Sequence, residues 1–177
     1  MGADGRAVGR ARNGSHKRLR PQGLLVRDAR ALLGLLVLPH EWAHKLALAP
    51  WAEELRTELA PPADVSGVAL ARLSGGLEPG VPPNAVRFGA LAPMALYGSL
   101  VGILSLWGGL GGLALPGGLA LAFWAAPSAG DLAIARDPSV VVATGRLDAA
   151  GTVSAQLHGL SAAATGGIAV LFVTVLL

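Results

Sequence analysis

The chain alternates between long apolar segments and shorter polar ones. Residues 31–51 are almost entirely apolar, no charged residue occurs from position 88 to 130, and residues 159–177 form a last apolar segment. About 20 apolar residues are needed to cross the hydrocarbon core of a bilayer as a helix. The uncharged region has room for two such helices, with a turn in its glycine-rich part and the second helix at 116–135. The pattern therefore predicts an all-α membrane protein with about four transmembrane helices.

A polar segment separates the first two predicted helices. Residues 52–87 carry scattered Glu, Asp and Arg among Pro and Gly, which is typical of a loop outside the membrane. Within it, residues 65–73 partly alternate between apolar and polar, and residues 81–88 can supply a return strand. We therefore expect a small β-hairpin at the membrane surface between the first and second transmembrane helices.

Composition supports the membrane assignment and limits the chemistry. The 177 residues are 53% hydrophobic and only 14% charged, which is too apolar for an ordinary soluble domain. We expect a multi-pass protein of the cell membrane, with residues 23–177 as one membrane-embedded domain. Cysteine is absent, so any metal must be held by His and carboxylate side chains.

The positive charge is concentrated at the N-terminus. Eight of the 14 Lys and Arg residues lie in the first thirty positions, and residues 1–22 have few apolar side chains. This composition predicts a disordered basic tail. No aromatic residues are interleaved with the basic ones, so we expect no nucleic-acid binding. A basic tail next to a membrane helix instead predicts contact with the anionic lipid of a bilayer.

A zinc-binding motif interrupts the first apolar segment. His40, Glu41 and His44 form an H-E-x-x-H pattern, which on a helix places both imidazoles on one face with the carboxylate beside them. Ionisable residues at the centre of a membrane helix cost about 2.5–3.5 kcal/mol each on insertion scales, so a compensating partner is expected. The flanks have no polar face that a soluble amphipathic helix would need, and the polar motif also argues against a secretory signal peptide. Pro39 predicts a kink directly before the motif.

A hydrolytic zinc ion usually has three protein ligands and one open position. Asp131 is the best candidate for the third, because it lies about as far along its predicted helix as His44 does along the first. Asp131 can at the same time cap a short helix after residues 127–130. His158, which borders the last apolar segment, is the alternative ligand.

With these residues, the sequence resembles the site-2 family of intramembrane zinc metalloproteases in a short, divergent form. The resemblance rests on HEWAH at 40–44, on an Ala-Pro turn in the second helix at 89–93, and on PSAGD at 127–131. It departs from that family in having Leu132 after the aspartate and no Asn in the third helix, so the oxyanion-stabilising group is not identified. The resemblance implies a site facing the cytosol, whereas the basic N-terminus predicts the opposite side.

Two functions follow as hypotheses. The first is a zinc metalloendopeptidase that hydrolyses peptide bonds of membrane-associated proteins, with zinc on His40, His44 and Asp131 and with Glu41 as the catalytic general base. The second is a non-catalytic membrane protein whose structural or vestigial zinc site serves a binding or regulatory role. A metal transporter is poorly supported, because one His pair and one carboxylate do not make a translocation pathway.

Overall fold

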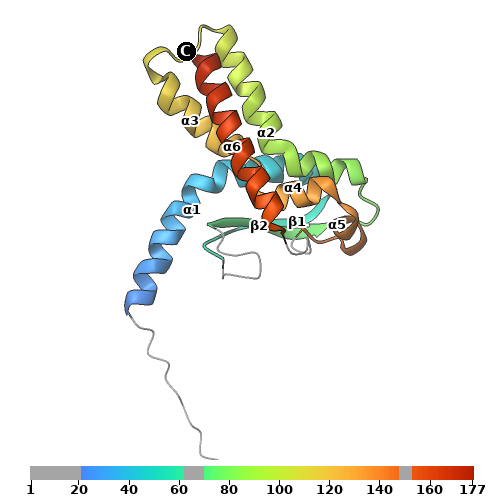
Figure 1. The fold of residues 1–177 in the computed structure, drawn as a ribbon. Coiled ribbons are helices and arrows are strands. Elements are labelled where there is room, and N and C mark those ends of the chain that lie inside the picture. The colour runs from blue at the N-terminus through green and yellow to red at the C-terminus, as the bar shows by residue number, and fades with distance from the viewer. Residues whose placement is uncertain (1–20, 62–69, 148–152) are drawn as a thin grey trace, which may run out of the picture.

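The computed structural model describes residues 21–61, 70–147 and 153–177, and it is mostly helical (Figure 1). Most of the predicted basic tail, residues 1–20, lies outside the described residues. The main elements, in chain order, are α1 (Pro21–Leu48), β1 (Ala52–Leu59), β2 (Ala71–Leu77), α2 (Pro83–Leu106), α3 (Ala114–Ala125), α4 (Ala129–Arg136), α5 (Ser139–Thr144) and α6 (Ala155–Leu176), with short 3-10 turns at Ala49–Trp51 and Gly111–Leu113.

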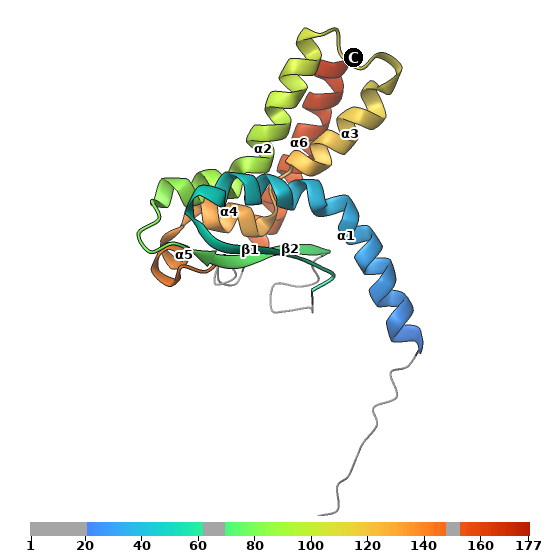
Figure 2. The same ribbon diagram turned by 180° about the vertical axis from the view of Figure 1, so that it is seen from behind.

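Helices α2, α3 and α6 stand together as a bundle, and the C-terminal part of α1 crosses beneath it, between the bundle and the hairpin (Figures 1 and 2). Small residues allow close approach: a Cβ on Gly118 of α3 would lie 2.9 Å from the Val173 side chain of α6. The buried apolar side chains of this bundle core come from α1, α2, the start and body of α3, and α6, and they are Ala43, Tyr97, Val101, Ala114, Leu121, Ala122, Ala125, Phe172 and Leu176.

A second cluster of buried apolar residues lies at the hairpin end of the molecule. It joins the end of α1, strand β2, the start of α2, and the segment around α5, and it consists of Leu48, Leu77, Val81, Ala85, Val86, Val141 and Leu147. The His40–His44 segment of α1 runs between the bundle core, which includes Ala43, and this hairpin core, which includes Leu48. The two cores therefore hold the His40–His44 segment of α1 from both sides.

The hairpin exists, but the predicted strands were wrong in part. The structure pairs β1 with β2 antiparallel, with Thr57 opposite Leu73. Of the predicted strand 65–73, residues 65–69 lie outside the described residues and the end belongs to β2. The predicted return strand 81–88 instead begins α2, because Pro83 occupies the first helical position, where its fixed φ favours a helix start. The actual partner strand has the sequence AEELRTEL, and the charged residues on its exposed face give it the composition of a loop.

Two described helices are long and apolar enough to span a membrane, α2 and α6. Residues Gly111–Ala125 and Ala129–Arg136 pass the same test only as a pair bent by 46°, which gives up to three spans in the described part of the chain. Helix α1 is not among them, since polar residues at 40, 41, 44 and 45 interrupt its apolar run. The number of four transmembrane helices is therefore not confirmed.

Candidate metal centre

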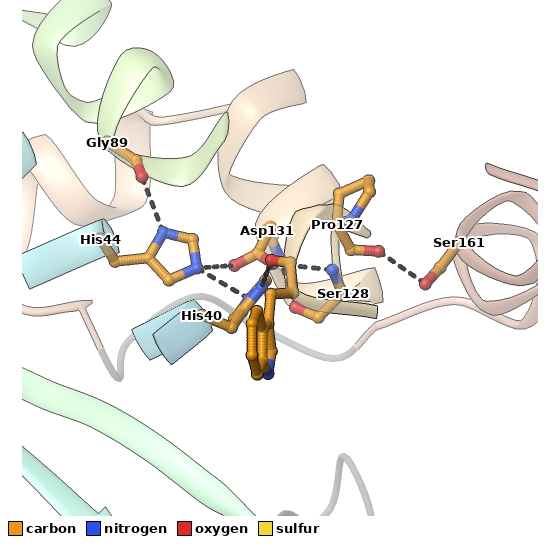
Figure 3. Close-up of polar contacts among 8 residues, drawn as sticks. His40, His44, Gly89, Pro127, Ser128, Asp131 and Ser161 are labelled. Carbon is orange, nitrogen blue, oxygen red and sulfur yellow. Dashed lines mark hydrogen bonds and ion pairs between the residues drawn. The ribbon is translucent and has the colours of Figure 1, made fainter. Parts of the chain in front are cut away.

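Three of the predicted site residues converge at one point, although they are separated by almost ninety positions in the chain. His40 and His44 lie one turn apart on α1, and their Nε2 atoms are 3.0 Å from each other (Figure 3). Asp131 of α4 reaches both: its Oδ2 is 3.3 Å from Nε2 of His40, and its Oδ1 is 3.2 Å from Nε2 of His44. All three side chains are largely shielded from solvent. These residues form a group that can hold a metal ion.

The outer nitrogens of both imidazoles are hydrogen-bonded to backbone carbonyls. Nδ1 of His40 lies 2.9 Å from the carbonyl oxygen of Trp124, and Nδ1 of His44 lies 2.7 Å from that of Gly89. A carbonyl oxygen can only accept, so each Nδ1 must carry the proton and donate it. In a neutral imidazole this leaves the Nε2 lone pair free, and both lone pairs point at the same place as the Asp131 carboxylate.

This arrangement of acceptors fits a cation. Two neutral imidazole nitrogens and a carboxylate offer lone pairs to one another and no hydrogen, so their contacts of 3.0–3.3 Å are favourable only with a positive charge among them, which a metal ion or a proton on one Nε2 can supply. Four ligands at zinc bond lengths of about 2.0–2.1 Å are separated by about 3.3 Å in a tetrahedral site. The two Nε2–carboxylate distances, 3.3 Å to Oδ2 and 3.2 Å to Oδ1, lie close to that value, and the Nε2–Nε2 distance of 3.0 Å is shorter, so the residues can hold a zinc ion after small adjustments.

Asp131 reaches the site because the chain breaks between α3 and α4. Ser128 is the N-cap of α4: its Oγ accepts a hydrogen bond from the Asp131 N–H, and its own N–H donates to Asp131 Oδ2 at 2.7 Å. The aspartate therefore takes part in the cap of α4, as predicted, and lies beside the two histidines, where it could serve as a metal ligand. The alternative ligand His158 is exposed on α6, where its Nδ1 bonds Ser154 within its own first turn.

The predicted general base is part of the same buried cluster. Glu41 is only 9% exposed and interacts electrostatically with His44, His40 and Asp131. Its carboxylate also accepts a hydrogen bond from the backbone N–H of Leu73 in β2. Strand β2 of the hairpin thus lies next to the Glu41 carboxylate.

Two aromatic side chains hold α1 around the predicted proline kink. The indole Nε1 of Trp124 donates to the Leu36 carbonyl at 2.7 Å, and the Tyr97 hydroxyl donates to the Pro39 carbonyl at 2.8 Å. Pro39 lies inside the helix, and α1 visibly changes direction along its length (Figure 2). These two donors therefore attach α1 to α3 and α2 on either side of the kink; the carbonyl that Pro39 itself releases is that of Leu35, four residues earlier.

Two functional groups were missed from the sequence, the backbone carbonyls of Gly89 and Trp124. Every residue has a carbonyl, so the sequence gives no direct sign of which ones orient the histidines. Two prolines are the indirect signal: Pro93 has no N–H for the Gly89 carbonyl four residues earlier, and Pro127 ends α3 before the N–H of Ser128 could reach the Trp124 carbonyl.

Comparison with known proteins adds no identification: no family model, curated protein or solved structure matches the chain.

Proposed function

We propose that this protein is a membrane-embedded zinc metallopeptidase that hydrolyses peptide bonds of membrane-associated proteins. The observation that carries the proposal is the convergence of His40, His44 and Asp131, with their acceptor atoms 3.0–3.3 Å apart, next to the buried carboxylate of Glu41. Two imidazoles and one carboxylate form a ligand set used by hydrolytic zinc, and they leave one position open for water or substrate. A metal site built only for structure is normally closed by a fourth protein ligand.

The residues divide the work of hydrolysis. His40, His44 and Asp131 would hold the zinc, which when bound would supply Lewis acidity to a water molecule and to the scissile carbonyl. Glu41 takes a proton from the attacking water and afterwards gives it to the departing amine. The backbone N–H of Leu73 keeps the Glu41 carboxylate oriented during both transfers. Asp131 contributes negative charge that balances the cation in an environment of low dielectric.

The membrane setting defines the class of substrate. Helix α6 exposes large apolar residues along its length, including Val170 at 70% and Leu171 at 56%, which a bilayer would cover. We extend the membrane assignment to α1 and the bent α3–α4 pair, which gives a four-span protein of the cell membrane with zinc as its cofactor. Because an intact helix hides its carbonyls, the substrate must present an unwound segment of a membrane-associated protein.

The test compares two variants in purified, detergent-solubilised protein with a membrane-tethered reporter. Glu41→Gln should bind zinc like the wild type but lose cleavage, because the amide cannot accept the proton. His44→Ala should lose both zinc and cleavage. Cleavage by the Glu41→Gln protein would refute the role of that residue. Zinc binding by the wild type without cleavage of any membrane reporter would instead support the non-catalytic alternative.

A further inference from the structure

The backbone groups that orient the metal ligands come from places where a helix is interrupted. In a regular α-helix each carbonyl accepts a hydrogen bond from the N–H four residues later. The residue four positions after Gly89 is Pro93, which lies inside α2 and has no N–H. The Gly89 carbonyl is thus released from the ladder of α2 by Pro93, and it accepts the Nδ1–H of His44 at 2.7 Å.

The break between α3 and α4 leaves a carbonyl and an N–H without the hydrogen bond that a continuous helix would form between them. If α3 continued, the N–H of Ser128 would donate to the carbonyl of Trp124, again four residues earlier. The chain instead leaves the helix at Ala126, whose extended backbone (φ −63°, ψ 122°) is the conformation favoured before a proline, here Pro127. The unused Trp124 carbonyl accepts from His40, and the unused Ser128 N–H donates to Asp131 Oδ2 (Figure 3).

We infer that Pro93 and Pro127 are positioning residues of the metal centre, acting through the backbone groups that they release to the three ligands. Each ligand then has an outer partner supplied by an interrupted helix: Gly89 for His44, Trp124 for His40, and Ser128 for Asp131. A released backbone group suits this task because it is fixed by the helix axis and has no rotamer freedom to lose. The inference depends on the metal centre proposed above and does not depend on peptidase activity.

Ser128 offers a way to remove one released group with little change of backbone. Its φ of −67° is the angle that a proline ring imposes, so Ser128→Pro fits the φ at this position while deleting the N–H. Ser128→Ala deletes the Oγ and keeps the N–H. The difference between the two variants therefore isolates the hydrogen bond to Asp131 Oδ2.

Pro93→Ala tests separately whether the Gly89 carbonyl must be free of a hydrogen bond within α2. The new N–H competes with His44 for the Gly89 carbonyl by restoring the helical bond. Pro116→Ala is the matched control, because Pro116 is in the first turn of α3, where an N–H has no carbonyl partner within the helix.

The experiment measures the zinc affinity of full-length protein in detergent by competition with a chromophoric chelator, together with the visible spectrum of the cobalt-substituted form. Circular dichroism of the metal-free protein checks that each variant keeps its helices. Loss of an outer-shell partner typically weakens metal binding by about 10–100-fold. We expect Ser128→Pro to bind zinc more weakly than Ser128→Ala by that factor, and Pro93→Ala to bind more weakly than Pro116→Ala by that factor, each with an altered cobalt spectrum. Pro116→Ala should stay within about threefold of wild type.

The outcomes are distinct. If folded Ser128→Pro binds zinc as tightly as Ser128→Ala, and Pro93→Ala binds as tightly as Pro116→Ala, the inference is overturned. If one proline-related variant loses its helices, the other decides the matter alone. A protein that binds zinc with the expected pattern but cleaves nothing would refute the proposed peptidase and leave the inference intact.

Discussion

Asp131 is the residue whose substitution tests the metal centre most informatively, because its two roles can be separated. Asp131→Ala removes the metal ligand and also the oxygen that accepts the Ser128 N–H at 2.7 Å. Loss of such a capping interaction costs about 1 kcal/mol of stability. Asp131→Asn keeps one side-chain oxygen for the cap but loses the charge and one ligand oxygen. The metal-free Asn variant should therefore be nearly as stable as the wild type, and the metal-free Ala variant about 1 kcal/mol less stable.

Zinc should reveal the ligand role in both variants. At free zinc 100 times its dissociation constant, binding stabilises the wild type by about 2.7 kcal/mol. Loss of a direct ligand should weaken binding at least as much as the roughly 100-fold upper end for outer partners, which leaves about 0.4 kcal/mol at the same zinc concentration. The lost 2.3 kcal/mol or so corresponds to a smaller zinc-induced shift in melting temperature, by roughly 5–9 °C.

The assay is thermal unfolding in detergent with and without zinc, alongside metal analysis. Asp137→Asn is the control, since Asp137 accepts a hydrogen bond from the Ser139 N–H just before α5 and is not a member of the metal group. It should keep the full zinc-induced shift. An Asp131→Asn protein with an undiminished shift and unchanged zinc content would show that Asp131 is not a ligand, and His158 would then be the next residue to test.

Two further substitutions probe how the helices hold the site. In Gly89→Ala, the new Cβ would lie 2.3 Å from Leu48 Cδ2. Because the Leu48 side chain is buried, we expect α1 and α2 to move apart and the Gly89 carbonyl to move away from His44. Zinc affinity should fall in Gly89→Ala and recover in part when Leu48→Ala is added. Gly98→Ala is the control, because the space around its Cβ is open, and it should leave zinc affinity unchanged. Failure of the double variant to recover affinity would contradict this packing account. Trp124→Phe removes the hydrogen bond from the indole to the Leu36 carbonyl but keeps the backbone carbonyl at position 124. We expect the free energy of unfolding to fall by about 1 kcal/mol and the zinc affinity to stay within a few-fold of wild type. A large loss of zinc affinity would mean that the indole itself positions His40.

The sequence allowed much of the site to be predicted, and the reason is physical. His40 and His44 follow from helical spacing alone, and Asp131 follows from the cost of an unpaired carboxylate in an apolar helix together with its depth along that helix. The structure brings these three together as expected. The carbonyls that orient the histidines could not be predicted, because backbone groups carry no sequence signature until the positions of helix breaks relative to a distant helix are known.

The fold was predicted less completely. Long apolar runs correctly indicated helices, since hydropathy is a property of each segment by itself. The strand β1 is hard to recognise because its Glu and Arg side chains are exposed. Its partly buried residues, Ala52, Leu55 and Thr57, give only a weak alternation beside strong charges. Pairing between strands depends on residues elsewhere in the chain, so one segment read alone could not specify it.

The central claim is that one divalent cation is bound by two imidazoles and a carboxylate within the helices. X-ray absorption spectroscopy of zinc-loaded protein in detergent tests it most directly, because it reports the type and distance of the ligands. We predict one zinc ion per chain with two imidazole nitrogens and only oxygen as its other ligands, at about 2.0–2.1 Å. Absence of stoichiometric zinc, or a spectrum with fewer than two imidazoles, would contradict the account.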